Sequence, residues 1–121
     1  MKNLLARLLL CLLPFAACGQ AQANDFPTVD RVLYVEECIA THPGPHFEMV
    51  NKCSCALDAL AGTVKFDDYV EMSTAAKATS IGGERGGYIR DVEMLQDQIK
   101  RYKALQSKVE KGCFLGAAVP R

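Results

Sequence analysis

Four cysteines carry the chemistry that the sequence offers most clearly, namely Cys38, Cys53, Cys55 and Cys113. If the chain is exported, as its first residues indicate, an even number of cysteines predicts two disulfide bonds, and four cysteines can pair in three ways. Cys53 and Cys55 are two residues apart, which separates their side chains by about 200° around a helix. Their sulfur atoms then point to nearly opposite sides, so each should bond a different partner.

Two pairings satisfy this geometry. One joins Cys38 to Cys53 and Cys55 to Cys113; the other joins Cys38 to Cys55 and Cys53 to Cys113. We favour the first pairing. In an antiparallel hairpin that turns near Pro43, Cys53 lies closer than Cys55 to the height of Cys38 along the helix axes. A disulfide that closes a loop of about 15 residues contributes roughly 3 kcal/mol, and one that closes a much longer loop roughly 4 kcal/mol. We therefore expect reduction to unfold most of the domain.

The Cys-Ser-Cys motif has a second interpretation, because two histidines lie just upstream of it. His42, His46, Cys53 and Cys55 are suitable ligands for zinc or copper, and they form the alternative hypothesis of a metal-handling module. Against it, a proline-glycine-proline turn sets the spacing of the histidines, and the site would take two cysteines away from disulfides. A thiol-redox module is a related alternative, although the sequence has no C-x-x-C pair. The main prediction contains no metal and no cofactor.

The segment from Ser80 to Tyr88 is rich in glycine and is expected to be a loop between helices. It lacks the residues of a phosphate-binding loop, and no strand precedes it as in a dinucleotide fingerprint. It is either a flexible connection with glycines at positive φ or a loop that binds a partner. In the second case Arg85 would contact a carboxylate or phosphate, and Tyr88 would be an aromatic anchor. The candidate partner loop consists of Gly82, Gly83, Glu84, Arg85, Gly86, Gly87 and Tyr88.

No combination of residues typical of a catalytic site is present in the sequence. Asp67 and Asp68 are adjacent, which suits the first turn of a helix better than acid–base chemistry. We therefore predict no catalytic residue and a non-enzymatic protein. The chain has 14 Lys plus Arg and 14 Asp plus Glu, and the first 23 residues contain two of the bases, Lys2 and Arg7. This balance excludes nucleic-acid binding through bulk positive charge.

Four predicted helices must position these residues, and no segment alternates like a strand. The helices cover residues 28–41, a range from just after Pro45 to just before Gly62, residues 66–79 and residues 91–111. The loop between the first two helices is short, so they must be antiparallel neighbours. The predicted fold is all-α, a small disulfide-stapled bundle of about four helices built on an antiparallel helical hairpin.

Apolar residues at helical spacing indicate which face of each helix is buried. The expected inward positions in the first and second helices are Val32, Val35 and Ile39, then Val50, Cys53, Leu57 and Leu60. Those in the third and fourth are Phe66, Tyr69, Val70 and Ala76, then Val92, Leu95, Ile99, Tyr102 and Val109. Gln106 interrupts the last of these stripes, and Leu105 is expected to cover the gap. Three methionines are expected to fill the core, namely Met49, Met72 and Met94.

The first residues predict export. Lys2 and Arg7 bracket the start of an apolar run that ends near Phe15, which is too short to span a membrane. An Ala-Gln-Ala site predicts cleavage before Asn24, so residues 1–23 would be a signal peptide. Residues 24–121 would be a single helical domain with a glycine-rich loop at 80–88 and a loose C-terminal tail. Alternatively, the surroundings of Cys18 resemble a lipobox, which would leave the protein lipid-anchored to a bacterial membrane through this cysteine.

The whole frame resembles small exported four-cysteine helical proteins of proteobacteria. The features that carry the resemblance are the signal peptide, Cys38, the Cys-Ser-Cys helix, the glycine-rich loop and Cys113. The resemblance implies a periplasmic or secreted protein held together by disulfides, and it transfers no activity to any residue.

Charge is distributed unevenly along the predicted domain. Residues 24–76 contain 9 acids and 3 bases, whereas residues 77–121 contain 5 acids and 9 bases. Acidic helices packed beside a basic one would explain this distribution, as would a dipolar surface that steers a partner. The predicted function is a non-enzymatic periplasmic binding or accessory protein that associates with a larger exported protein or enzyme complex. Its expected partner is another periplasmic protein, without nucleic acid and without a transmembrane helix in the mature form.

Overall fold

The computed structural model describes residues 24–116, and within this range the chain forms five helices and no strand. The helices are α2 (Thr28–Thr41), α3 (His46–Ala61), α4 (Phe66–Ala78), α5 (Gly83–Asp91) and α6 (Glu93–Gly112). The predicted all-α class is confirmed. None of the helices in this part of the chain is long and apolar enough to cross a membrane. The predicted signal peptide, Cys18 and residues 117–121 of the predicted loose tail, which was expected to begin at Phe114, lie outside the described residues.

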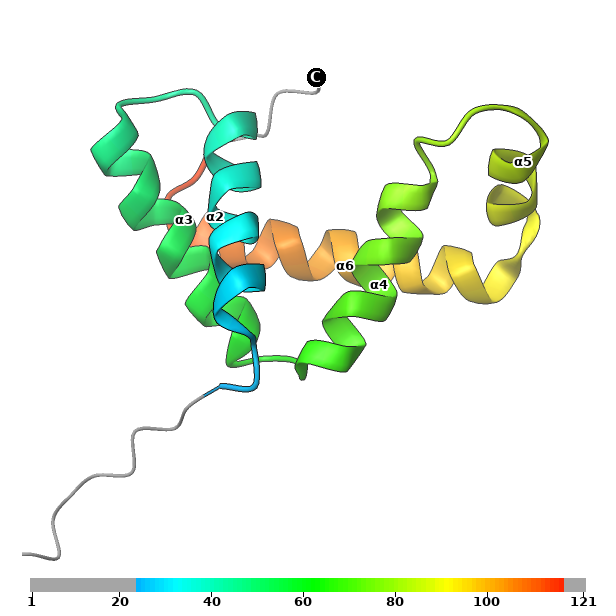
Figure 1. The fold of residues 1–121 in the computed structure, drawn as a ribbon, viewed down its shortest axis with the longest axis horizontal. Coiled ribbons are helices and arrows are strands. Elements are labelled where there is room, and N and C mark those ends of the chain that lie inside the picture. Colours follow the sequence, from blue (N-terminus) through cyan, green and yellow to red (C-terminus); the bar gives the residue numbers. More distant parts are fainter. Residues whose placement is uncertain (1–23, 117–121) are drawn as a thin grey trace, which may run out of the picture.

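Helices α2 and α3 form the predicted hairpin (Figure 1). Proline favours an extended conformation in the preceding residue, and His42, just before Pro43, has φ −115° and ψ 104°. Helix α3 then starts directly after Pro45. Helix α6 runs across α3 and α4 and packs against both, so it joins the hairpin to the second half of the chain (Figure 1).

Aromatic rings connect three of the helices at the centre of the fold. The ring of Tyr69 on α4 lies 5.2 Å from Phe26, 6.4 Å from Tyr34 on α2 and 6.2 Å from Tyr102 on α6, measured between centroids. Aromatic pairs at such distances contribute about 0.5–1.5 kcal/mol each beyond their burial. The largest side chains that are almost fully buried are Leu60, Met72 and Cys53.

The buried faces of α3 and α6 follow the predicted stripes, whereas those of α2 and α4 are rotated. Tyr34 and Cys38 occupy the inner positions of α2, and Met72 is an inner residue of α4. Helix α2 packs mainly against one helix, α3, so its buried face is narrow. Val32 on α2 and Val70 on α4 are exposed as a result, although both were expected to face inward. Met94, expected to fill the core, is also exposed, at the start of α6.

The predicted loop at residues 80–88 is wrong for most of its length, because helix α5 begins at Gly83. Gly83 adopts φ +76°, a conformation that costs glycine little, and this turns the chain into the helix. Gly86 is buried against the preceding turn: a Cβ atom there would lie 1.9 Å from the carbonyl oxygen of Ile81. The glycines therefore allow a close approach of two backbone segments, and Gln96 of α6 fixes the far end by donating to the carbonyl of Ile89 at 3.0 Å.

Helix α6 ends one residue later than predicted, with Gly112 still helical. The N–H of Leu115 donates to the carbonyl of Glu110 at 3.0 Å, and that of Phe114 to the carbonyl of Lys111 at 3.3 Å. This pattern is a Schellman cap, in which glycine usually takes the left-handed position. Here Phe114 takes it, with φ 58° and a side chain that is 83% exposed.

Candidate functional site between α2 and α6

Both disulfides are formed, and their pairing is the one favoured from the sequence. Cys38 is bonded to Cys53, and Cys55 is bonded to Cys113, with Cα–Cα distances of 5.9 and 5.8 Å. Cys53 is fully buried between α2 and α3, whereas Cys55 lies on an exposed side of α3. The two residues face different helices, as their spacing requires.

The structure does not bring together the alternative metal ligands. Cys53 and Cys55 are held in separate disulfides and offer no thiolate, while His42 is buried and His46 is exposed. Among residues 24–116 no group of three or more His, Cys, Asp or Glu side chains is arranged to hold a metal ion. The hypothesis of a site built from these four residues is therefore wrong.

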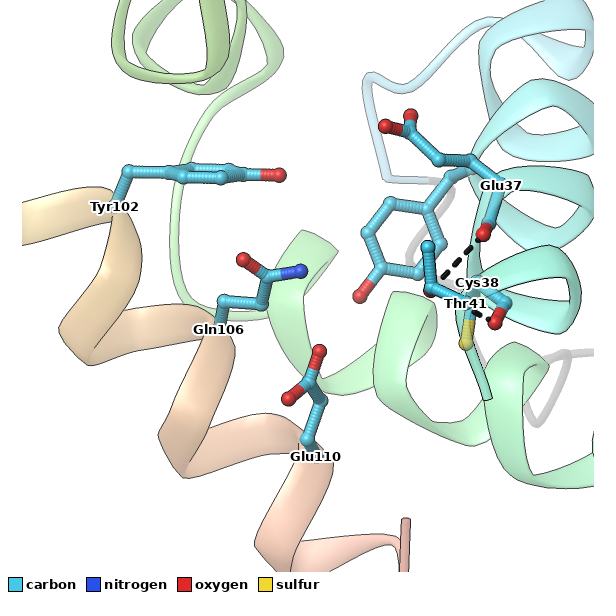
Figure 2. A pocket seen from close by; sticks show the side chains of 7 residues that line it. Glu37, Cys38, Thr41, Tyr102, Gln106 and Glu110 are labelled. Carbon is cyan, nitrogen blue, oxygen red and sulfur yellow. Dashed lines mark hydrogen bonds between the residues drawn. The ribbon is translucent and has the colours of Figure 1, made fainter. Parts of the chain in front are cut away.

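A polar cavity of about 100 Å³ opens between α2 and α6. It exists because α2 packs on α3 rather than on α6 over most of its length. Its lining residues, which define what we call the α2–α6 pocket, are Tyr34, Glu37, Cys38, Thr41, Tyr102, Gln106 and Glu110. Figure 2 shows the α6 side chains pointing toward the end of α2.

Helical spacing explains how the pocket is built. Tyr102, Gln106 and Glu110 follow each other at four-residue intervals, which puts them on one face of α6. On α2, Tyr34 and Thr41 are seven residues apart and also share a face. The sequence analysis did not predict this site, although Gln106 interrupts an apolar stripe of α6. The signal in the sequence was that Gln106 is followed one turn later by a second polar residue, Glu110, on the same face of α6.

The two phenols of the pocket remain protonated far above neutral pH. Burial raises the pKa of Tyr34, and the nearby carboxylate of Glu110 raises it further. Burial likewise raises the pKa of Tyr102, with further contributions from the neighbouring tyrosines. Each hydroxyl is therefore a neutral group that can both donate and accept a hydrogen bond.

The two carboxylates of the pocket differ in their partners. Glu37 lies at the surface and accepts a 2.7 Å hydrogen bond from Nζ of Lys77, which raises the pKa of that lysine. Glu110 is largely buried, with 15% of its side chain exposed, and its one ion-pair partner in residues 24–116 is His42. Since no Lys or Arg lines the pocket, its interior is acidic.

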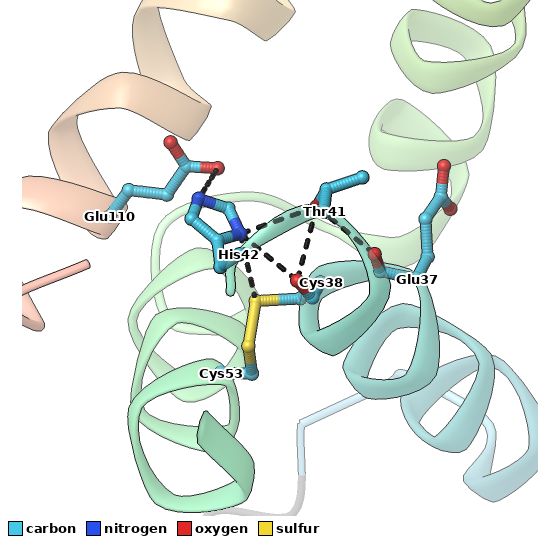
Figure 3. Close-up of polar contacts among 6 residues, drawn as sticks. All are labelled: Glu37, Cys38, Thr41, His42, Cys53 and Glu110. Carbon is cyan, nitrogen blue, oxygen red and sulfur yellow. Dashed lines mark hydrogen bonds and ion pairs between the residues drawn. A yellow bond between two sulfur atoms is a disulfide. The ribbon is translucent and has the colours of Figure 1, made fainter. Parts of the chain in front are cut away.

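His42 lies between Glu110 and the Cys38–Cys53 disulfide (Figure 3). Its Nδ1 lies 3.0 Å from the carbonyl oxygen of Cys38. Nδ1 also lies 3.2 Å from Oγ1 of Thr41, and the tautomer of the ring decides which of these contacts it makes as a donor. The buried Nε2 has no hydrogen-bond partner in the described structure and lies 3.8 Å from Oε1 of Glu110.

Comparisons with protein-family models, curated proteins and solved structures match none of them. The assignment of a site therefore depends on the chain's own residues.

A second hollow lies beside the glycine-rich segment. This apolar groove has a volume of about 430 Å³ and is bordered by α4, α5 and α6. Its lining residues are Val70, Glu71, Thr74, Ala75, Ala78, Ile89 and Leu95.

The structure separates the residues of the predicted partner loop. Glu84 and Tyr88 are exposed on α5, and Tyr88 precedes Ile89, which lines the groove. Gly86 is buried and cannot contact a partner, while the side chain of Arg85 lies outside what the structure describes. The side chains of Glu84 and Tyr88 are therefore available for binding, whereas Gly86 is not.

Proposed function

We propose that this protein is a non-catalytic exported binding protein that associates with a larger exported protein through the apolar groove. The observation that carries the proposal is the groove itself, whose walls are mainly alkyl surface from three helices. Val70 is 41% exposed there, and Tyr88 on the adjoining helix is 69% exposed. Contiguous exposed apolar surface of this kind is typical of an interaction site.

The chemistry of the groove favours the apolar face of a partner helix. Grooves between helices commonly receive an amphipathic helix, whose apolar side chains recur every three to four residues. Glu71 is a carboxylate at the groove, and it would suit a basic residue flanking the apolar face of such a helix. Helix α5 contains three glycines among nine residues and so has a low intrinsic helix propensity, which a bound partner would offset.

Export is part of the same proposal. The N-terminal segment has the composition of a signal peptide, and two disulfides suit an oxidising compartment. Cleavage before Asn24 gives a periplasmic or secreted protein, whereas lipidation of Cys18 gives an anchored one. Intact mass measurement of the protein from its source organism distinguishes the two.

A matched pair of variants tests the groove. Val70→Lys places a charge in the groove, and Val32→Lys places the same charge on α2, where the valine is 54% exposed. Cross-linking in the exported fraction should recover the same partner with wild type and Val32→Lys, but not with Val70→Lys. Addition of the purified partner should also protect the amides of residues 83–91 from hydrogen exchange. Equal recovery with both variants would overturn the proposal.

A further inference from the structure

We propose that the outer face of helix α6 binds a membrane surface that carries anionic headgroups. This face, which we call the basic face, consists of five exposed residues, namely Lys100, Arg101, Lys103, Lys108 and Lys111. None of these five lines the apolar groove or the α2–α6 pocket. Membrane binding is therefore independent of the proposed function, and either can fail without the other.

Helical spacing gathers the five bases on one side of α6. At 3.6 residues per turn, they fall within an arc of about 160° around the helix axis. Arg101 and Lys108 are seven residues apart, so they leave the helix in nearly the same direction. The same is true of Lys100 and Lys111, which are three turns apart. Tyr102 is buried on the opposite side of α6, where the helix packs against α3 and α4. The bases can therefore approach one surface together.

The carboxylates of the chain leave most of the basic face unpaired. Within residues 24–116 only Lys100 of the five bases has an ion-pair partner, Asp97 at 3.6 Å. These two side chains are 77% and 72% exposed, and exposed pairs contribute little. Glu110 is the one acid between residues 100 and 111, and only 15% of its side chain is exposed. An anionic surface would therefore meet a cationic face, although residues 24–76 contain more acids than bases.

The composition of the basic face favours lipid headgroups over a protein partner. Four of its five bases are lysines, whose ammonium groups act as point charges, whereas arginine suits fixed two-point contacts. The residue at the centre of the face is Ala104, and the nearest ring on α6, that of Tyr102, is buried. The face thus lacks the aromatic anchors that dominate protein interfaces. A cluster of about four to eight bases on an amphipathic helix is typical of binding to anionic lipids.

Vesicle binding tests the proposal. The purified, oxidised protein is sedimented with vesicles that contain phosphatidylglycerol and phosphatidylcholine, and with vesicles of phosphatidylcholine alone. Labelled polyglutamate serves as a soluble acidic polypeptide. We expect binding to the anionic vesicles that weakens as added salt screens the charges, and no binding to the neutral ones. Equal binding to both kinds of vesicle, or tighter binding to polyglutamate than to the anionic vesicles, would overturn the proposal.

Matched double variants locate the binding on α6. Lys103→Gln combined with Lys108→Gln should weaken binding to the anionic vesicles more than tenfold, since each base near such a surface contributes a factor of about five. Lys65→Gln combined with Arg90→Gln is the control, because it removes two bases from exposed positions outside α6. We expect the control to retain most of the binding. An equal loss in both double variants would show that net charge, and not the basic face, attracts the vesicles.

Lysine labelling gives a second measurement in the wild-type protein. Brief acetylation with and without anionic vesicles, followed by peptide mapping, measures how strongly each lysine is protected. Vesicles should protect Lys103 and Lys108 more than Lys65, which is equally classed as exposed but lies at the start of α4. Equal protection of all three lysines would contradict the assignment of the surface to α6.

Discussion

Gly86 lies so close to Ile81 that any side chain at residue 86 would collide with the Ile81 carbonyl oxygen, 1.9 Å from the position of a Cβ atom. A Gly86→Ala substitution must therefore push the start of α5 away from the preceding turn. We expect it to destabilise this helix by about 1–3 kcal/mol. Hydrogen exchange of the amides in residues 83–91 should accelerate accordingly.

The neighbouring glycine provides the control. A Cβ atom at Gly87 would meet nothing closer than a guanidinium nitrogen of Arg90 at 3.9 Å. Because alanine favours a helix over glycine by about 1 kcal/mol, Gly87→Ala should slow exchange in the same residues. Slower exchange in both variants would show that the close approach at Gly86 has been misjudged.

The two disulfides should open in a fixed order. Cys55 is exposed, whereas Cys38 and Cys53 are both buried, so a thiol reagent reaches the Cys55–Cys113 bond first. Mild reduction followed by alkylation and peptide mapping should yield an intermediate that is labelled at Cys55 and Cys113 only. Labelling of Cys38 and Cys53 in the earliest intermediate would contradict this order.

Complete reduction should unfold most of the domain. The disulfides close loops with sequence separations of 15 and 58 residues, which correspond to about 3 and about 4 kcal/mol. Together these are a large share of the 5–15 kcal/mol that is typical of a domain. Circular dichroism with and without reductant measures the loss, with a Cys55→Ser, Cys113→Ser double variant as the intermediate case. Unchanged helicity and melting after full reduction would refute the estimate.

Alkaline pH should destabilise the protein through three buried tyrosines. Burial raises the pKa of Tyr34, Tyr69 and Tyr102 above the ordinary value of about 10. The unfolded chain therefore loses these phenolic protons first, so the stability is fully present below pH ~10 and falls as the pH rises further. Each phenol contributes a slope of up to about 1.4 kcal/mol per pH unit.

Chemical denaturation between pH 9 and pH 12 measures this slope. Tyr102→Phe should reduce it by about one third, because one of the three phenols is removed. Tyr88→Phe is the matched control, since that ring is 69% exposed and leaves the buried set intact. An unchanged slope in Tyr102→Phe would argue against its contribution.

The left-handed conformation of Phe114 is expected to reduce stability. A residue with a Cβ atom pays roughly 1–2 kcal/mol at such a φ, and glycine avoids this cost. Because the phenylalanine side chain is 83% exposed, its removal loses little burial. Phe114→Gly should therefore raise the melting temperature, whereas Phe114→Ala, which keeps the Cβ atom, should not. A lower melting temperature for the glycine variant would show that the aromatic ring contributes more than the backbone costs.

Helix ranges and the disulfide pairing were accessible from the sequence because both follow from local rules. Pro43 and Pro45 determine where the hairpin turns. The spacing of Cys53 and Cys55 leaves two possible disulfide pairings, and the position of Cys38 along the hairpin favours the one that is formed. Helix α5 was missed because local propensity opposes it: glycine disfavours helices, and the contact of Gly86 with Ile81 is visible only in the fold.

The α2–α6 pocket was missed for a different reason. Its residues lie on two helices far apart in the sequence, and the cavity depends on where α2 fails to reach α6. Gln106 within an apolar stripe marked a polar position on α6, but no local rule paired it with Tyr34. The predicted buried faces of α2 and α4 are also partly wrong for this reason. The width of a buried face depends on how many helices pack against it, which the local sequence does not show.

The arrangement of the disulfides also determines whether a single proteolytic cut separates the chain into two fragments. A single cut between Cys38 and Cys53, or between Cys55 and Cys113, leaves both fragments covalently joined. Between Cys38 and Cys113, only the two peptide bonds around Ser54 lie outside both loops, and cleavage there would split the molecule into two disulfide-closed halves. These bonds are in the middle of α3, where a protease must first unfold the helix to reach them. The cut that would separate the two disulfide-closed halves therefore requires α3 to unfold locally first.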